Sequence, residues 1–315
     1  MTIDPTHTAF LFPGQGSQAV GMGAELAAAS PEAAAVFRQA DELLGFPLSQ
    51  LMWDGSAADL NETDNTQPAL LVHSVAVLRA LQQRLPGFQP RFAAGHSLGE
   101  FSALVAAEAL NFSDAVSLVR ARGKAMKAAG QAQPGGMAAV LGLELHQVVA
   151  ACRQASAAAE GGVWLANDNC PGQVVISGSN EALTRATELL QTAGARKVVR
   201  LAVSIAAHSP FMQAAQADFQ GALDAVELRD PAIEVIGNVN AAPLTTAEAV
   251  RADLSAQLTA NVRWTESIRA MLAAGVTDFV ELGSGEVLTG LVKRIDRAAG
   301  RHNLDSPDSL AALLD

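Results

Sequence analysis

Apolar residues in the first part of the chain fall into short runs of strand length, separated by longer segments with helical spacing. In one such segment Ser30 stands at the N-cap position and Pro31 at the first helical position. The spacing predicts, in order, strand 8–12, helix 31–44, helix 67–85, strand 92–94, helix 100–109 and helix 113–130. Strands that alternate with helices in this way indicate an α/β fold.

The pattern changes after residues 133–136, where glycine and proline interrupt the helical spacing. The following segment predicts strand 137–141, helix 145–158, strands 163–167 and 173–177, helix 181–193 and strand 197–203. The order β-α-β-β-α-β is that of a ferredoxin-like unit. We therefore expect a subdomain at 134–203, inserted into a larger α/β domain formed by 1–133 and 204–315.

The larger domain is expected to resume after this insertion. The predicted elements are helix 210–226, strand 233–237, helix 247–258, helix 264–275, strand 278–282 and, after a glycine-containing loop at 283–285, a last helix. The fold class predicted from the whole pattern is therefore α/β, with a parallel-sheet core and one inserted ferredoxin-like subdomain.

Composition and charge narrow the range of functions. The chain has 21 Lys and Arg against 32 Asp and Glu, a formal charge of −11, which argues against nucleic acid as a partner. Its two cysteines form no CxxC pair, which favours a reduced, cytoplasmic setting and no structural metal. The polar start has no signal-peptide pattern, and no apolar run approaches the roughly 20 residues of a membrane span.

The most informative motif is GHSLGE at residues 95–100. Its core, G-x-S-x-G between a predicted strand and a predicted helix, is typical of a nucleophile elbow. In such a turn Ser97 would project at the helix N-terminus, and the amide N–H of Leu98 could stabilise an oxyanion. An ordinary glycine-bounded turn is the structural alternative.

A glycine-rich loop at residues 14–19 follows the first strand. It fits the dinucleotide pattern G-x-G-x-x-A, but the stretch that should carry the second strand and its acidic residue has helical spacing instead. Supplying the second donor of an oxyanion hole fits better, and a plain turn remains possible.

A serine nucleophile needs a base, and the chain has six histidines. His208 is the best candidate, because it follows the point where the inserted unit rejoins the main domain, and clefts form at such seams. A buried structural histidine is the alternative. Arg122, one helix beyond the elbow, could pair with a substrate carboxylate or lie on a solvated helix face.

Several separated motifs together resemble one family. FPGQGSQ at 12–18, GHSLGE at 95–100, RGK at 122–124, NDNCPGQVVIS at 167–177, the segment 203–208 and NVRWTES at 261–267 occur here in that family's order. The chain resembles the malonyl-CoA:acyl-carrier-protein transacylases of fatty-acid synthesis and, more broadly, the acyltransferase domains of polyketide synthases.

The resemblance implies a hydrolase-like core with a ferredoxin-like subdomain, and a ping-pong transfer of malonyl from malonyl-CoA to a holo acyl carrier protein through a malonyl-serine ester. It implies no metal, nucleotide or redox cofactor. The implied roles are Ser97 as nucleophile and His208 as base, Gln15 and Leu98 as oxyanion donors, Arg122 as carboxylate ligand, Asn167 and Asn169 in the cleft, and a carbonyl near Gln257 orienting His208.

Two departures from the family pattern bear on specificity. Ile205-Ala206-Ala207 precedes His208, where the fatty-acid enzymes usually carry Pro-Ser, so acceptance of branched units stays open. Ser284 stands where the family's Gly-Pro-Gly has proline. We expect a cytoplasmic monomer. A serine hydrolase, a non-catalytic subunit that binds carrier proteins, and the transacylase of a malonate-decarboxylating system are the alternatives.

Overall fold

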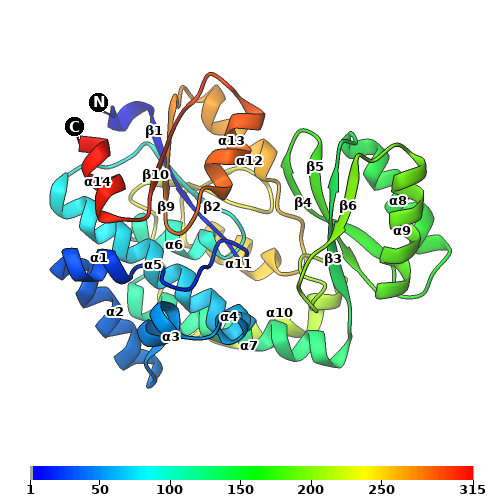
Figure 1. The fold of residues 1–315 in the computed structure, drawn as a ribbon, viewed down its shortest axis with the longest axis horizontal. Helices are drawn as coiled ribbons and strands as arrows, with labels where there is room; N and C mark the ends of the chain where they lie inside the picture. The colour runs from blue at the N-terminus through cyan, green and yellow to red at the C-terminus, as the bar shows by residue number, and fades with distance from the viewer. Residues whose placement is uncertain (1–2, 315) are drawn as a thin grey trace.

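A six-stranded sheet forms the centre of the larger part of the molecule in the computed structural model, which describes residues 3–314 (Figure 1). Its order is β10 (Gly300–Leu304), β9 (Asp278–Leu282), β1 (Thr8–Phe12), β2 (Phe92–Gly95), β7 (Glu234–Ile236) and β8 (Pro243–Leu244). All neighbours are parallel except β7 and β8. The loops that follow β1, β2 and β9 therefore meet at one edge, where open α/β sheets place their sites.

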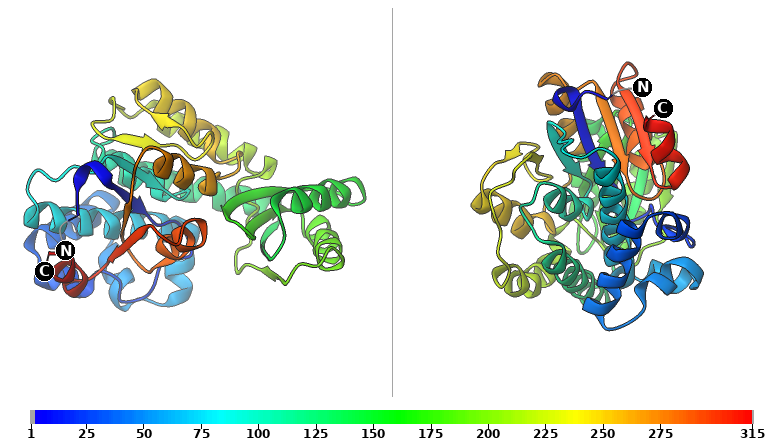
Figure 2. Two further views of the ribbon diagram at one scale, coloured as in Figure 1. Left: turned by 90° about the horizontal axis from the view of Figure 1, so that it is seen from above. Right: turned by 90° about the vertical axis from the view of Figure 1, so that its left-hand side faces the viewer.

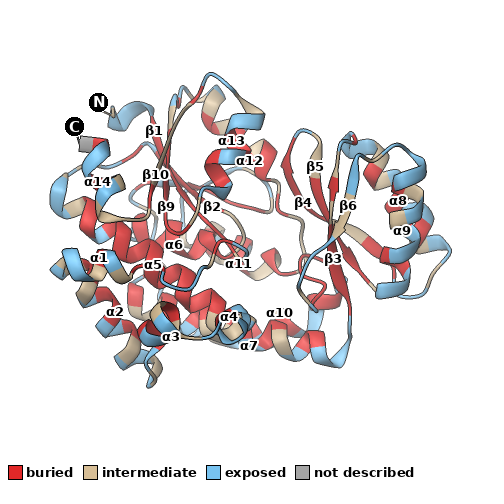
Figure 3. Cartoon of the chain, viewed as in Figure 1, coloured by how far each residue is buried: buried red, intermediate tan, exposed pale blue. Residues whose placement is uncertain are grey.

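Side chains of β1 alternate between two buried layers. Phe10 and Phe12 belong to a core shared with α5, α6 and α7, whereas Ala9 and Leu11 pack with α12 and α13 on the other face. Both faces of the sheet are thus covered, which explains why the central strands β1 and β2 are buried along their whole length (Figures 2 and 3).

The helices around this sheet vary widely in length. They are α1 (Ala24–Ala29), α2 (Pro31–Leu44), α3 (Leu48–Asp54), α4 (Ala57–Asn61), α5 (Thr63–Arg84), α6 (Gly99–Ala106), α7 (Phe112–Ala132), α10 (Gln213–Asp224), α11 (Ala247–Gln257), α12 (Trp264–Ala273), α13 (Val287–Ile295) and α14 (Pro307–Leu314). Short 3-10 turns occupy Pro5–His7 and Pro210–Met212. Within residues 3–314, no helix is both long and apolar enough to cross a bilayer.

The smaller unit has its own antiparallel sheet and its own core. It contains β3 (Gly136–Leu141), α8 (Leu145–Ala157), β4 (Val163–Cys170), β5 (Gln173–Gly178), α9 (Asn180–Thr192) and β6 (Lys197–Arg200). The strand order β4-β5-β3-β6 and the βαββαβ sequence confirm the predicted ferredoxin-like arrangement (Figure 1). The division of the chain at 134 and 203 stays a prediction.

Several predicted boundaries were wrong. Strand β4 extends to Cys170 rather than residue 167, and β6 ends at Arg200 rather than residue 203. The sequence pattern missed the short helices α1, α3, α4 and α14 and the edge strands β8 and β10, because elements this short carry little periodicity. His302 lies in β10.

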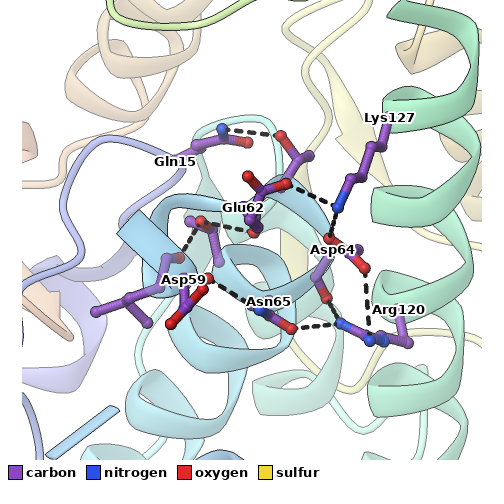
Figure 4. A network of polar contacts seen from close by, with 10 residues as sticks. Gln15, Asp59, Glu62, Asp64, Asn65, Arg120 and Lys127 are labelled. Atoms are coloured by element: carbon purple, nitrogen blue, oxygen red, sulfur yellow. Dashed lines mark hydrogen bonds and ion pairs between the residues drawn. The ribbon is translucent and has the colours of Figure 1, made fainter. Parts of the chain in front are cut away.

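Helix α5 begins at Thr63, before the predicted start at residue 67, and contains Pro68. Proline has no N–H to donate to the carbonyl four residues earlier, which belongs to Asp64. The Arg120 side chain on α7 donates to that carbonyl instead (Figure 4). The helix therefore continues through the proline with its free carbonyl satisfied.

Candidate active site

The turn between β2 and α6 is the sharp strand-to-helix bend that the GHSLGE motif predicts. Ser97 has φ +52°, in the left-handed region. A Cβ on Gly95 would lie 1.9 Å from the carbonyl carbon of Gly99, so a glycine is required where the chain crosses itself. A strained non-glycine residue held by such close packing is typical of functional sites.

His208 faces the Ser97 hydroxyl across the cleft. Its Nε2 lies 2.8 Å from Ser97 Oγ, and its Nδ1 lies 3.0 Å from the carbonyl oxygens of both Gln257 and Ala260. Carbonyls only accept, so Nδ1 carries the ring proton and Nε2 is free to accept from the serine. His208 also has a positive φ, +57°, and its amide donates to the Leu258 carbonyl.

Burial keeps the His208 imidazole neutral. The ring is 5 % exposed, and desolvation, followed by the positive charge of Arg122, lowers its pKa to about 3. A neutral imidazole within hydrogen-bond reach of a serine hydroxyl can act as a general base.

Arg122 on α7 brings a buried cation to the same point. It is 1 % exposed, and its Nη2 donates to Gln257 Oε1 at 2.9 Å and to Ser97 Oγ at 3.2 Å. Burial lowers its pKa only to about 10, so the guanidinium remains charged at neutral pH. Among the described residues no carboxylate forms an ion pair with it, which leaves the cation available to a ligand.

The loop after β1 lies beside the elbow. Phe12 pairs with Gly95 in the sheet, and the His96 amide donates to the Phe12 carbonyl. Within residues 3–314, no protein acceptor takes the amide N–H of Gln15 or of Leu98. The loop does not form a dinucleotide site of the Rossmann type, because five helices and no second strand follow it before β2.

Side-chain contacts hold this loop against the start of α5 (Figure 4). Gln15 Nε2 donates to Thr63 Oγ1 at 3.4 Å, and Gln18 Nε2 donates to Asn61 Oδ1 at 2.7 Å. Lys127 on α7 pairs with Glu62 at 2.7 Å and with Asp64 at 3.2 Å, which fixes the same turn from the other side. The ordered position of the Gln15 amide thus depends on the junction between α4 and α5.

The smaller unit contributes two asparagines to the site. Asn167 and Asn169 stand two residues apart on β4; both line the cleft and both are largely buried. Asn169 Oδ1 lies 2.8 Å from His96 Nε2, and the His96 ring packs edge-on against Trp264. His96 therefore stabilises the wall of the cleft, and His208, not His96, is the histidine in contact with the Ser97 hydroxyl.

The cleft between the two units encloses about 300 Å³. Its lining includes Ser97, His208, Arg122, Leu98, Gln15, Asn167 and Asn169, together with apolar side chains from Met126, Met137, Leu201, Val287 and Leu288. Ala207 lines it, whereas the Cβ of Ala206 faces Gly135. Within the described residues no cluster of His, Cys, Asp or Glu is suited to hold a metal ion.

Sequence reasoning missed Asn238. Its side chain accepts from the Ser97 amide at 2.7 Å and donates to the Gly95 carbonyl at 2.7 Å, so it fixes both sides of the elbow. Its place just after β7, at the carboxyl edge of the parallel sheet, is the signal that could have found it.

Comparisons with known proteins agree with this geometry. The family model described as "Acyl transferase domain" matches residues 9–301. The malonyl CoA-acyl carrier protein transacylase of Bacillus subtilis is 45 % identical over 303 residues, covering 96 % of this chain and 94 % of the relative.

Solved structures match over nearly the whole chain. An acyl carrier protein S-malonyltransferase from Vibrio cholerae superposes with a TM-score of 0.94 at 42 % identity, covering 98 % of this chain and 100 % of the other. A malonyl-transacylase in complex with a type II polyketide synthase acyl-carrier protein gives 0.93 at 40 % identity, covering 98 % and 99 %. The chain therefore belongs to the malonyl-CoA:acyl-carrier-protein transacylases, within the acyl transferase domain family.

Proposed function

We propose that this protein transfers a malonyl group from malonyl-CoA to the phosphopantetheine thiol of an acyl carrier protein, and so supplies fatty-acid biosynthesis. The observation that carries the proposal is the position of Ser97 Oγ between His208 Nε2, at 2.8 Å, and Arg122 Nη2, at 3.2 Å. The nucleophile Ser97 thus has a base on one side and a buried cation on the other. A substrate with a thioester and a carboxylate needs both, the base for the attack on the thioester and the cation for the carboxylate.

In the first half-reaction Ser97 Oγ attacks the thioester carbon while His208 Nε2 takes the hydroxyl proton. The C–S bond then breaks, and the imidazolium returns that proton to the departing CoA sulfur. The product is a malonyl ester on Ser97. No oxidant, metal or nucleotide enters this balance, because one thioester is exchanged for an oxygen ester.

The tetrahedral intermediate places negative charge on the former carbonyl oxygen. The amides of Gln15 and Leu98 have no acceptor in the part of the chain that the structure describes, and they come from the two loops that meet at the sheet edge, so we assign them as the oxyanion donors. One such donor typically contributes a factor of about 10²–10³ to the rate.

Arg122 is assigned to the malonyl carboxylate. Its guanidinium can form the planar, two-point pairing that a carboxylate offers. An acyl group without that carboxylate leaves a buried cation unpaired, which costs about 3–5 kcal/mol. Selection of malonyl over acetyl follows from this difference, and Asn167 and Asn169 complete the wall around the acyl chain.

In the second half-reaction the pantetheine thiol enters the same cleft. It gives its proton to His208, its sulfur attacks the ester carbon, and the Ser97 oxygen leaves and regains the proton. The apolar lining from Leu201, Val287 and Leu288 suits the arm that carries the thiol. A hydrolase would give Arg122 no comparable task. The monomeric state, the cytoplasmic location and the absence of nucleic-acid binding stay predictions.

The test is the intact mass of the protein after mixing with malonyl-CoA, methylmalonyl-CoA or acetyl-CoA, followed by holo carrier protein. We expect a malonyl adduct that passes to the carrier. Ser97→Ala should abolish it, with a loss of at least about 10³-fold in transfer rate. Ser117→Ala, on the exposed side of α7, is the matched control.

Each outcome has a definite meaning. Free malonate without a persistent adduct or loaded carrier would show that water is the acceptor and that the protein is a hydrolase. An adduct in Ser97→Ala would place the nucleophile elsewhere. Comparable adducts with methylmalonyl-CoA would show that the alanines before His208 admit a branched unit.

A further inference from the structure

Two carboxyl groups lie buried beneath the elbow, and the mechanism above uses neither. Glu100 on α6 is 0 % exposed, and Asp253 on α11 is 6 % exposed. Both carboxyl groups lie at the same backbone turn: the Asn238 amide donates to Glu100 Oε2 at 3.1 Å and the next amide, of Val239, donates to Asp253 Oδ1 at 3.3 Å. Glu100 Oε1 and Asp253 Oδ2 are buried, and no donor among the described residues 3–314 reaches either of them. Two carboxylates can share a hydrogen bond only if one of them holds a proton.

The other oxygen of Glu100 accepts two hydrogen bonds. The Asn238 amide and Gln257 Nε2 each donate to Glu100 Oε2 at 3.1 Å. Because Gln257 Nε2 also donates to the Ser97 carbonyl, its amide nitrogen faces Glu100 and its oxygen faces Arg122. Glu100 thereby sets the direction of the side chain that holds Arg122, and supports the asparagine that holds the Ser97 amide.

Burial and the neighbouring carboxyl favour a neutral Glu100. The positive charge of Arg122 acts in the opposite direction, but its guanidinium donates to the Gln257 amide oxygen and not to Glu100. Burial raises the pKa of Glu100 well above its ordinary range, and the negative charge of Asp253 adds to that shift. An ionised Glu100 would instead place a second negative charge between Asp253 and the elbow.

We propose that Glu100 is a positioning residue that keeps a proton and donates it in a hydrogen bond to Asp253. The pair then carries one negative charge, located on Asp253, and Arg122 stays free to meet the carboxylate of a substrate. A protonated Glu100 thus contributes to the selection of malonyl, because it leaves the charge of Arg122 available to the substrate. The consequence for selectivity rests on the proposed malonyl transfer, whereas the protonation state does not.

A glutamine side chain has the shape and the hydrogen-bonding groups of a protonated glutamic acid but cannot ionise. Replacing Glu100 with glutamine therefore tests which protonation state the site needs. In Glu100→Gln the amide can donate to Asp253 while its oxygen accepts from Asn238 and Gln257. We expect kcat/KM for malonyl transfer to fall by less than about threefold in E100Q. In E100A, which leaves Asp253, Asn238 and Gln257 without their partner, we expect a fall of at least about 30-fold, mainly in kcat.

Infrared spectroscopy detects the proton on the carboxyl group without any measurement of activity. The infrared spectrum of the wild type at neutral pH, minus that of E100Q, should contain the C=O stretching band of one protonated carboxylic acid. Loss of the same band in Asp253→Asn, with its retention in E100Q, would place the proton on the aspartate and overturn the assignment. Absence of any acid band would also overturn it.

The kinetic outcomes are equally decisive. An E100Q protein that fails to fold, or loses as much kcat/KM as E100A, shows that a carboxylate is needed, and the proposal is then wrong. If the wild type proved to transfer no malonyl at all, the infrared band would still test the protonated state. Failure of the proposed function and failure of this inference are therefore distinguishable.

Discussion

The two units of the molecule differ in where they bury polar side chains. The core of the smaller unit, between its sheet and the helices α8 and α9, consists of alanine, valine, leucine and isoleucine with one cysteine, Cys152. Its buried polar side chains lie on the strands β4 and β5: Asn167, Asp168, Asn169 and Ser177. The larger unit also has a broad apolar core, but beneath the elbow it buries Glu100, Arg122, His208 and Asn238. Ser97 and His208, its two facing residues, both have left-handed backbone conformations.

This difference indicates which unit holds the candidate catalytic residues. Buried polar groups and left-handed residues cost stability, and they persist only where the surrounding packing fixes them. The larger unit supplies that packing and holds the atoms that we propose to react, Ser97 Oγ and His208 Nε2. The smaller unit folds by apolar packing and adds a wall to the cleft, so we expect its changes to affect binding more than chemistry.

The largest effect should come from the buried cation. In Arg122→Ala we expect kcat/KM for malonyl-CoA to fall by about 10²–10³-fold, because a buried charge pair with the substrate is lost. The rate of acylation by acetyl-CoA should fall far less, so the ratio of the two measures the effect. Arg153→Ala, on α8 of the smaller unit, is the control. An unchanged malonyl-to-acetyl ratio would contradict the assignment.

The pH profile should give the next largest difference, measured against the profile expected for an ordinary histidine. A histidine with its ordinary pKa of about 6.5 would lose about 30-fold in base activity at pH 5. Burial lowers the pKa of His208 to about 3, so the free enzyme keeps its neutral base as pH falls to 5. We expect kcat/KM for acylation to stay nearly level from pH 7.5 to 5, measured by rapid quenching. A fall with a midpoint near 6.5 would show that the ring is solvated.

The smallest effect should come from the wall of the smaller unit. Asn169→Ala removes the hydrogen bond to His96 and one polar group of the cleft. We expect KM for malonyl-CoA to rise by about three- to tenfold, with kcat changed by less than about threefold. Thr192→Ala, at the exposed end of α9, should change neither. A loss mainly in kcat would mean that this unit takes part in the chemistry, which would break the contrast between the two units.

Motifs local in the sequence were enough to predict much of the site. The elbow at 95–100 and the loop at 14–18 depend on glycine spacing, and the ferredoxin-like unit on the order of its strands. His208 could be chosen because it stands at the seam between two predicted units. In the structure its ring nitrogen lies 2.8 Å from Ser97 Oγ.

The remainder depends on contacts that no local pattern carries. Asn238 and Asp253 act on the elbow from more than 130 residues away in the chain. Glu100 is in the GHSLGE motif, but the role that we propose for it depends on the carboxyl group of Asp253, on another helix. The start of α5 was predicted too late, at residue 67: the helix begins at Thr63 and continues through Pro68, and a side chain from α7 binds the carbonyl that the proline leaves free.

The two carbonyls at His208 Nδ1 have a consequence for the choice of acceptor. A carboxylate there would stabilise the imidazolium and make the ring a stronger base, whereas neutral carbonyls do so less. A weak base suffices for a thiol, whose pKa is about 8.5. Bulk water, at about 15.7, is a far harder acid to deprotonate. The Ser97 hydroxyl is held 2.8 Å from this base, whereas a water molecule would have to be both positioned and deprotonated. We therefore expect the acyl ester to react with the carrier thiol faster than with water.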